Sequence, residues 1–400
     1  MKQIIIALGC LIYVGNAAAT SVGEYMARAS DCVACHTAQG GQPMAGGKKF
    51  STPVGDIYAT NITPDKTAGI GNYSYEDFEK AVRQGIAKDG HALYPAMPYP
   101  SYAKMTDADI HSLYDYFMKE VPPSDVKNKD NDIPWLLSAR WPLHVWNWLY
   151  VDKTQPETKA IQPDDKNAIL LSRGAYLVEG PGHCGACHTP RGVTMQEKGY
   201  DASSDVYLSG AMIDGWYAPS LRDITMPSEE LKDLLRMGRS QHSAISGPMS
   251  EVVTQSTQYL TDSDLDAISY YLLNFNHRNP TPVATDGSIV YSPTDGKILY
   301  SMYCSTCHGD DGKGKDFTVP SLANNSVVTA KDPSSLISVI NQGAETPQTQ
   351  GNISFKMPAY KEIMSADEMT NVVNYVRGTW GNGAPQVKKD DVANMEDAAK

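Results

Sequence analysis

The chain has 400 residues, which is too long for one ordinary core and indicates two or three domains. Its 34 basic and 46 acidic side chains give a formal net charge of -12. This balance argues against nucleic acid or anionic lipid as a direct partner, because both carry negative charge.

The first residues, MKQIIIALGCLIYVGNAAATSVG, have the pattern of a secretory signal peptide. Lys2 precedes a short apolar run, and small residues follow it, so we expect a signal peptide at residues 1–19, cleaved after Ala19. The run is shorter than the roughly 20 apolar residues that span a bilayer. A lipoprotein signal ending at Cys10 is the alternative. No later stretch resembles a transmembrane helix, so we expect a periplasmic protein with peripheral membrane contact.

The first predicted domain covers residues 20–151 and is helical. Serine, threonine and aspartate before a helix, and glycine after it, mark the predicted helix ends. In chain order its elements are a helix containing Gly23 and Tyr25, the motif Cys32-x-x-Cys35-His36, a helix from Ser74 to Gly85, a proline-flanked loop with Met97, and a helix opened by a capping box of Thr106 and Asp109.

The same order of elements returns twice after a polar, proline-bearing linker at residues 152–166. The second predicted domain covers residues 167–280: a helix with Gly174 and Tyr176, the motif Cys184-x-x-Cys187-His188, a helix from Ser228 to Gly238, Met249, and a capping box of Thr261 and Asp264. The third covers residues 281–383: Gly296 and Tyr300, Cys304-x-x-Cys307-His308, a helix from Asp332 and Pro333 to Gly343, Met357, and a capping box of Ser365 and Glu368. Residues 384–400 form a polar tail that we expect to be disordered.

Zinc, disulfides and covalent haem compete to explain the three Cys-x-x-Cys-His motifs. A structural zinc takes four ligands, usually from two neighbouring pairs, but each pair here lies over a hundred residues from the next. Disulfides give no reason for a histidine after every second cysteine. The motif is the attachment signature of c-type haem, and cysteines at i and i+3 with a histidine at i+4 share one helical face. We therefore predict three covalently bound haem c groups, attached through Cys32, Cys35, Cys184, Cys187, Cys304 and Cys307.

Each haem iron needs two axial ligands. The motif histidines His36, His188 and His308 supply one, and we predict that Met97, Met249 and Met357 supply the other. Met97 and Met249 follow their histidines at the same separation of 61 residues, while the third separation is shorter. His91 and His242 leave bis-histidine ligation open in the first two domains; the third has no histidine after His308, and Met364 is its less well-placed alternative.

The stretch DCVACHTAQGGQPMAGGKKFSTPVGDIYATNITPDKTAGIGNYSYEDFEKAVRQG, followed by GHALYPAMPYPSYAKMTDADI, resembles the first haem domain of triheme cytochrome c subunits of membrane-bound dehydrogenases. The likeness covers the mature chain except the tail. It implies an all-α fold of three tandem cytochrome c-type domains with one covalent haem each. It also implies that the Asn61 loop lies at a haem edge, although an ordinary turn would explain the loop as well.

The resemblance implies an electron-transfer role. Such subunits carry electrons to ubiquinone from the catalytic subunit of gluconate 2-dehydrogenase, related sugar-acid and polyol dehydrogenases, or quinoprotein alcohol dehydrogenase. We expect a flavoprotein partner and no substrate-converting site in this chain, since capped irons pass electrons rather than bind substrate. The alternatives are a haem enzyme of peroxidase type with a displaceable axial methionine, and an electron-transfer subunit of a molybdenum-dependent oxidase.

The stretch SARWPLHVWNWLYV, residues 138–151, is the most unusual feature outside the motifs. Trp141, Trp146 and Trp148 stand beside the predicted linker. They are expected to pack between the first two domains and shield haem edges, or else to form a membrane-facing or quinone-adjacent belt. His144 is expected to be packed or exposed rather than a ligand.

Overall fold

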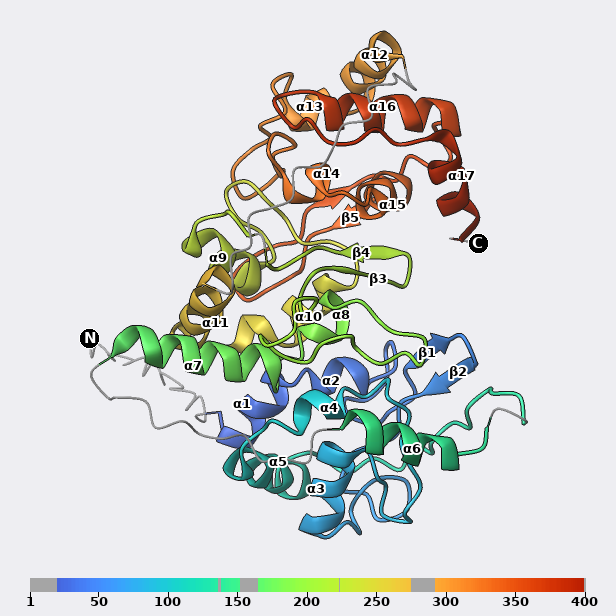
Figure 1. The fold of residues 1–400 in the computed structure, drawn as a ribbon, viewed down its shortest axis with the longest axis vertical. Helices are drawn as coiled ribbons and strands as arrows, with labels where there is room; N and C mark the ends of the chain where they lie inside the picture. Colours follow the sequence, from blue (N-terminus) through green and yellow to red (C-terminus); the bar gives the residue numbers. More distant parts are fainter. Residues whose placement is uncertain (1–19, 136–137, 152–164, 223, 275–291, 399–400) are drawn as a thin grey trace, which may run out of the picture.

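The computed structural model describes residues 20–135, 138–151, 165–222, 224–274 and 292–398. The predicted signal peptide and nearly all of the predicted linker 152–166 lie outside these residues, as does much of the boundary between the second and third predicted domains. Three groups of elements follow one another along the long axis of the molecule (Figure 1). We call them the first segment (residues 20–151), the second segment (165–274) and the third segment (292–398).

The described residues are mainly helical. The first segment contains α1 (Val22–Ala29), α2 (Cys32–Cys35), β1 (Lys49–Thr52), β2 (Gly55–Tyr58), α3 (Tyr75–Gln84), α4 (Tyr99–Tyr102), α5 (Asp107–Lys119) and α6 (Trp141–Tyr150). The second contains α7 (Lys166–Glu179), α8 (Gly185–His188), β3 (Ala211–Ile213), β4 (Trp216–Ala218), α9 (Ser228–Met237), α10 (Met249–Gln255), the 3-10 helix η1 (Thr257–Tyr259) and α11 (Asp262–Asn274). The third contains α12 (Pro293–Tyr303), α13 (Ser305–His308), α14 (Ser326–Thr329), α15 (Ser334–Gln342), β5 (Ala344–Glu345), β6 (Lys356–Met357), α16 (Ala366–Gly378) and α17 (Lys389–Ala398).

Three antiparallel hairpins correct the expectation of an all-α fold. They pair β1 with β2, β3 with β4, and β5 with β6. Strands of two to four residues are too short to give a recognisable alternation of apolar and polar side chains. The overall character predicted from the sequence, a helical protein, is confirmed.

Helix ends lie close to where the cap residues predict them. In α3 the Ser74 side chain and Asp77 form a reciprocal capping box, and the helix ends at Gly85 with a φ of 62°. In α9 the cap position falls on Pro227, so Ser228 is the first helical residue instead of the cap. In α15 the cap is Pro333, one residue later than predicted.

Each segment packs its first helix against a later long helix at a glycine. A Cβ atom on Gly23 of α1 would lie 2.1 Å from the backbone oxygen of Ser112 in α5, and one on Gly174 of α7 would lie 2.1 Å from that of Ala267 in α11. Gly296 makes the equivalent contact between α12 and α16. Because no side chain fits at these positions, glycine allows the helix backbones to touch.

Each segment also has its own hydrophobic core. The third core extends into the predicted disordered tail, which corrects that expectation. Residues 389–398 form α17, and Val387 and Val392 are fully buried against the core of α15 and α16. Two apolar side chains therefore order a segment whose composition is otherwise polar.

Within the described residues, the structure has no helix that combines the length and the apolar character needed to cross a bilayer.

Candidate haem sites

Each Cys-x-x-Cys-His motif folds as a single helical turn, as predicted. The turns are α2, α8 and α13, and we call them the attachment turns. The six motif cysteines are free thiols, not paired in disulfides. The turn geometry places both thiols and the following imidazole on the same side of the backbone, which suits attachment of one planar group by two thioethers.

The three motif histidines are held in the same way. Nδ1 of His36 donates to the backbone oxygen of Thr60 at 2.7 Å, Nδ1 of His188 to that of Pro219 at 2.7 Å, and Nδ1 of His308 to that of Pro320 at 3.1 Å. This bond fixes the ring orientation and leaves Nε2 with its lone pair available for a metal. Burial lowers the pKa of all three imidazoles, which favours the neutral form that binds iron.

The first segment contains a cavity of about 340 Å³. Cys32, Cys35, His36 and Met97 all line it, so the four residues predicted to hold one haem lie around one space. Most of the remaining lining is apolar or aromatic, including Phe78 and other side chains of the core. A largely apolar cavity with two thiols and an imidazole fits a haem c, because the macrocycle is apolar and its iron requires a nitrogen ligand.

The motif thiols are poorly suited to bind zinc. Burial raises the pKa of Cys35 and Cys184 to about 12 and that of Cys187 and Cys304 to about 11. Zinc binds the thiolate, which these surroundings disfavour. Among the described residues, moreover, no three histidine, cysteine or acidic side chains are grouped as metal ligands.

The three candidate methionines lie in different local structures. Met97 follows a turn, Met249 is the first residue of α10, and Met357 lies in β6, where it pairs with Ala344. The expectation of a loop at every methionine therefore holds only in part. Each is partly buried against the same hydrophobic core as the first cysteine of its own motif. In every segment the methionine and the first motif cysteine thus share one core, and in the first segment they also line one cavity.

The competing histidines bond to carboxylates through Nδ1. Nδ1 of His91 contacts the Asp89 carboxylate at 2.5 Å, and Nδ1 of His242 contacts that of Glu230 at 2.8 Å. The His242 side chain is 56% exposed. His91 lies in the lining of the first cavity together with Met97, so it is the nearer competitor. His144 is exposed, which agrees with the prediction that it is not a ligand.

Asn61 acts as a clamp at the edge of the first cavity. Its Nδ2 donates to the backbone oxygens of Ser124 and Val126 at 2.8 and 2.9 Å, and its Oδ1 accepts from the backbone N–H of Thr63 at 2.9 Å. The side chain is almost fully buried and lines the cavity. The loop that carries the resemblance at TNITPD is therefore a cross-linked part of the cavity wall rather than an ordinary turn.

Two tyrosines at equivalent places in α1 and α7 join the first and second segments. The Tyr25 hydroxyl donates to the Asp264 carboxylate at 2.5 Å and accepts from the backbone N–H of Thr261 at 3.2 Å, at the start of α11. The Tyr176 hydroxyl donates to the Asp109 carboxylate and accepts from the N-cap N–H of α5 at 3.3 Å. Each of the two segments therefore contributes a tyrosine that bonds to the start of a helix in the other segment.

This exchange modifies two predicted capping boxes. Both threonine hydroxyls accept the expected backbone N–H, that of Asp109 or Asp264, at 3.2 Å. The N-cap N–H groups, however, donate to the tyrosines instead of the carboxylates. In α16, Ser365 and Glu368 complete the box as predicted.

The reciprocal contact continues at the attachment turns. The Lys48 ammonium donates to the backbone oxygen of Ala34, inside the first turn, at 2.9 Å, and to the carboxylate of Glu251 at 2.6 Å. Glu251 lies two residues after Met249 on α10. The first attachment turn is thereby tied to the methionine helix of the second segment.

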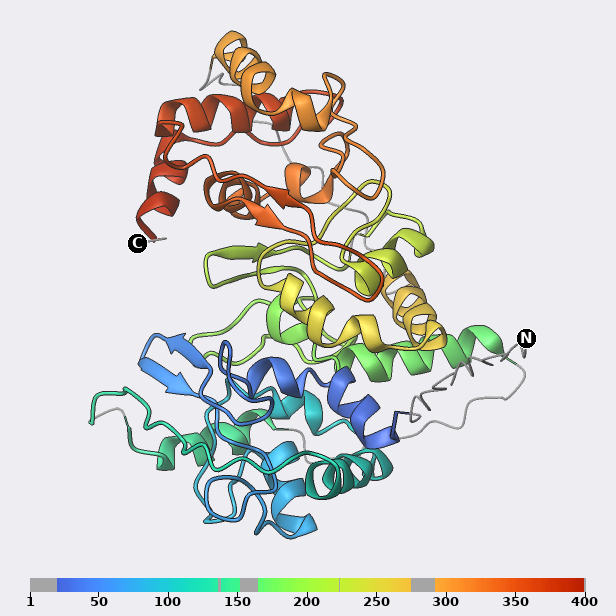
Figure 2. The ribbon, with the colours of Figure 1, turned by 180° about the vertical axis from the view of Figure 1, so that it is seen from behind.

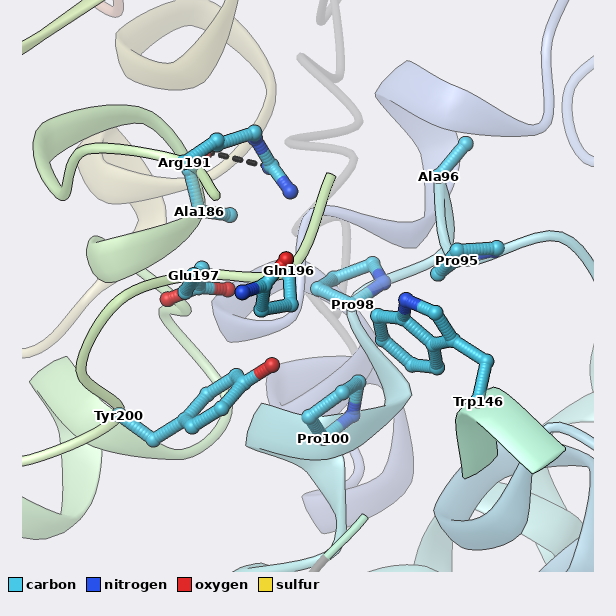
Figure 3. A pocket seen from close by; sticks show the side chains of 10 residues that line it. All are labelled: Pro95, Ala96, Pro98, Pro100, Trp146, Ala186, Arg191, Gln196, Glu197 and Tyr200. Atoms are coloured by element: carbon cyan, nitrogen blue, oxygen red, sulfur yellow. Dashed lines mark hydrogen bonds between the residues drawn. The ribbon is translucent and has the colours of Figure 1, made fainter. Parts of the chain in front are cut away.

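The second attachment turn lies beside the residues that flank Met97 of the first segment (Figure 3). Ala96 and Pro98, on either side of Met97, line a small cavity of about 20 Å³ together with Ala186, which lies inside the second attachment turn (Figure 3). Each attachment turn thus lies beside the methionine of the other segment. This places the two candidate haem sites next to each other.

The third segment contacts the second segment near the third candidate haem site. Ser335 of α15 accepts from the backbone N–H of Tyr217 at 3.0 Å and donates to its carbonyl at 2.9 Å. The backbone N–H of Ser321 donates to the carbonyl of His242 at 2.9 Å. Ser321 follows Pro320, whose carbonyl holds His308, so this contact reaches the wall of the third site.

The Cys-x-x-Cys-His motif does not reveal the backbone carbonyls that orient the histidines. A sequence signal exists for two of them, because Pro219 and Pro320 both begin a Pro-Ser-Leu triplet downstream of a motif. Thr60 begins Thr-Asn-Ile at the corresponding place. Lys48 has no such signal, because its two partners come from separate segments.

The predicted aromatic stretch divides between two environments. Trp146 packs between segments, with Nε1 donating to the backbone oxygen of Thr194 at 2.9 Å, as the packing interpretation predicts. Trp141 and Trp148, in contrast, are exposed.

Comparison with known proteins identifies relatives that are cytochrome c subunits of dehydrogenases. A family model described as cytochrome c matches residues 22–119 and 293–380. The chain is 46% identical to the gluconate 2-dehydrogenase cytochrome c subunit of Pantoea cypripedii, over 95% of this chain and 90% of that protein. It is 44% identical to the cytochrome c subunit of alcohol dehydrogenase (quinone) of Gluconacetobacter polyoxogenes, over 96% of this chain and 85% of that protein. It is 36% identical to the fructose dehydrogenase cytochrome subunit of Gluconobacter japonicus, over 95% and 83% of the two chains.

Proposed function

The chain belongs to the family of cytochrome c subunits that includes those of gluconate 2-dehydrogenase and alcohol dehydrogenase (quinone), and from this membership we propose the specific electron-transfer role that follows. The protein takes electrons from the catalytic subunit of a membrane-bound dehydrogenase and delivers them to ubiquinone. The favoured partner is a flavoprotein that oxidises D-gluconate or a related sugar acid or alcohol. The site of action is the periplasm, with peripheral attachment to the cytoplasmic membrane.

The proposal includes three cytochrome c-type domains, at residues 20–151, 167–280 and 281–383, each with one haem c. The observation that carries it is the triple repetition of one arrangement: two cysteines and a histidine on one turn, and Nδ1 of that histidine bound to a backbone carbonyl. A purely structural role for these histidines would not require Nε2 to be left available in all three motifs. The residues proposed to attach and ligate the three groups are Cys32, Cys35, His36 and Met97; Cys184, Cys187, His188 and Met249; and Cys304, Cys307, His308 and Met357.

A haem c with histidine and methionine in both axial positions supplies reversible one-electron transfer and offers no open position to a substrate. The chain's own residues give this chemistry its setting. The carbonyls of Thr60, Pro219 and Pro320 hold the imidazoles in the neutral, ligating form. The apolar walls of the cavity lower the local dielectric and restrict water, which are properties that tune a reduction potential.

The arrangement of the segments supports a relay. The second segment lies between the first and the third in both views (Figures 1 and 2), and its contacts to each neighbour reach the neighbour's candidate site. Electrons entering at one end of the molecule would therefore pass through the second segment to reach the other. The first and third segments can in this way serve two different partners.

The role is tested by gentle purification of the chain from its host with whatever subunit accompanies it. We expect a large periplasmic dehydrogenase, whose cofactor is identified by absorption and mass; flavin is favoured, pyrroloquinoline quinone second and molybdenum third. The complex should reduce a ubiquinone analogue when it is given substrate. The isolated chain should neither oxidise gluconate nor consume peroxide. Unchanged quinone reduction after this chain has been removed, or substrate oxidation by this chain alone, would contradict the role.

A further inference from the structure

Helix α6 has two faces with opposite surroundings. Its inner face is fixed by specific bonds: Asn147 donates to the backbone oxygen of Gln84 at 2.8 Å and accepts from the Tyr99 hydroxyl at 2.7 Å. Trp146, next to Asn147, is buried and bound to the Thr194 carbonyl at 2.9 Å. These contacts set the rotation of the helix, so the direction of its outer face is determined as well.

The outer face of α6 consists of Trp141, Val145, Trp148 and Leu149. The spacing of i, i+4, i+7 and i+8 places these four side chains on one stripe of the helix. All four are exposed, and the two tryptophans are 70% and 69% exposed. The helix lies at the margin of the molecule, away from the third segment (Figures 1 and 2).

Other exposed apolar residues lie before α6 in the chain and beside its inner-face contact. Trp135, which precedes α6, is exposed. Thr194, which contacts α6 through Trp146, is flanked by the exposed side chains of Val193 and Met195. Trp135, Trp141 and Trp148 are the exposed tryptophans among the described residues. The exposed indoles of the described chain thus all belong to α6 or to the short stretch that precedes it.

The charge of this region differs from that of the rest of the chain. Residues 133–151 contain no aspartate or glutamate, whereas the whole chain has 46 acidic residues and a net charge of -12. Arg140 and His144 are the ionisable groups of the stretch apart from Tyr150. The overall charge repels the molecule from a phosphate-rich surface, but the outer face of α6 presents no carboxylate that would add to this repulsion.

We propose that the outer face of α6 binds a phospholipid bilayer directly, with the helix lying in the plane of the interface. Tryptophan suits this position because its ring is apolar and its N–H can donate to a headgroup, and aromatic residues concentrate at that depth in membrane proteins. A protein partner is the competing occupant. An indole used at a protein interface fills a complementary pocket, whereas the stripe here is the convex side of one helix, which matches a deformable lipid surface. The proposal rests on one part of the proposed function, the peripheral attachment to the membrane, and assigns a surface to it.

The test uses the full holoprotein and vesicles of phosphatidylcholine, which is zwitterionic and so isolates the apolar contribution. We expect the protein to sediment with the vesicles and to remain bound in high salt, because burial of indole rings is not screened. The double variant Trp141→Gln/Trp148→Gln should bind at least about tenfold more weakly. The matched control is Ile298→Gln/Met302→Gln, which removes two exposed apolar side chains from α12 of the third segment and should bind like the wild type.

The depth of the tryptophans gives a second readout. Lipids brominated near the headgroup should quench the fluorescence of the wild-type protein, and the quenching should fall in the α6 double variant. Equal vesicle binding by the wild type and this variant would overturn the proposal, as would absence of wild-type binding. Loss of the catalytic subunit from the α6 variant with vesicle binding unchanged would assign the face to that subunit instead. Haem content and reduction of a quinone analogue test the electron-transfer role, and vesicle binding tests the outer face of α6. A failure of one proposal can therefore be distinguished from a failure of the other.

Discussion

The motif histidines differ from the competing histidines in what their Nδ1 atoms contact. His36, His188 and His308 donate to backbone carbonyls, while His91 and His242 contact carboxylates. A neutral carbonyl stabilises the donor tautomer with a free Nε2 lone pair. A carboxylate partner likewise leaves Nε2 available, because metal-binding histidines donate their other ring nitrogen to carboxylates as well as to carbonyls. What distinguishes the three motif histidines is therefore their place on the attachment turns beside the paired cysteines.

The methionine assignment can be tested one site at a time. Replacing Met357 with leucine keeps the volume but removes the thioether, so one haem in three should become high-spin when oxidised and should bind carbon monoxide when reduced. Absorption and electron paramagnetic resonance spectra measure both. Met364→Leu is the matched control, because Met364 is buried in the core of the same segment and should leave the spectra unchanged. A high-spin signal from the control variant, and none from Met357→Leu, would assign Met364 as the ligand.

A buried acid beside the first attachment turn gives a pH-dependent prediction. Asp31 is the N-cap of α2, and burial together with the nearby Glu251 raises its pKa to about 8. The folded protein therefore holds a proton that the unfolded chain releases, so this group should make stability fall as pH rises from about 4 to about 8.

The variant Asp31→Asn removes this titration, and asparagine tolerates the left-handed backbone at this position, where φ is 51°. Its melting temperature should therefore decline less than that of the wild type over the same range, by a few degrees. Parallel melting curves across pH for the two proteins would contradict the assignment.

Among the elements, α1 and α7 join the segments as well as building their own cores. Tyr25 and Tyr176 each replace one half of a capping box in the other segment. The variants Tyr25→Phe and Tyr176→Phe should each lower the free energy of unfolding by about 1–2 kcal/mol, because a carboxylate and a helix N–H lose a partner.

Denaturant titration of the single and double variants measures this coupling between segments. The double variant should separate the unfolding of the first and second segments into two transitions, since the contact is shared. Tyr114→Phe serves as the control, because its hydroxyl bonds to Tyr73 within the first segment. A single transition in the double variant, equal in midpoint to that of the control, would show that other contacts hold the segments together.

Element prediction from the sequence succeeds where a helix end has a local chemical cause. The Ser74 and Ser365 boxes are complete within four residues of chain, and both helices begin where these residues predict. The sequence does not reveal α17, whose order comes from burial of Val392 in a core built by distant residues. It also does not reveal the hairpins or the helical start at Met249, since neither has a long enough local pattern.

For the whole molecule, the repeated motif predicts the composition of each candidate site but not the relation between sites. Cysteine, histidine and methionine of the first segment meet around one cavity, as their spacing predicts. The pairing of each attachment turn with the other segment's methionine depends on Lys48, Glu251 and the turn around Ala186, which no local pattern connects. Such contacts between segments set the order of a relay, and they become visible only in three dimensions.

Intact-mass measurement of the mature protein under denaturing conditions decides whether one chain holds three covalent haem c groups. Thioether bonds survive denaturation, whereas an iron held by side-chain ligands alone is lost with the fold. We expect the mass of a chain that begins at Thr20 plus three haems. A mass equal to the bare chain, or to the chain with one or two haems in fully matured protein, would contradict it.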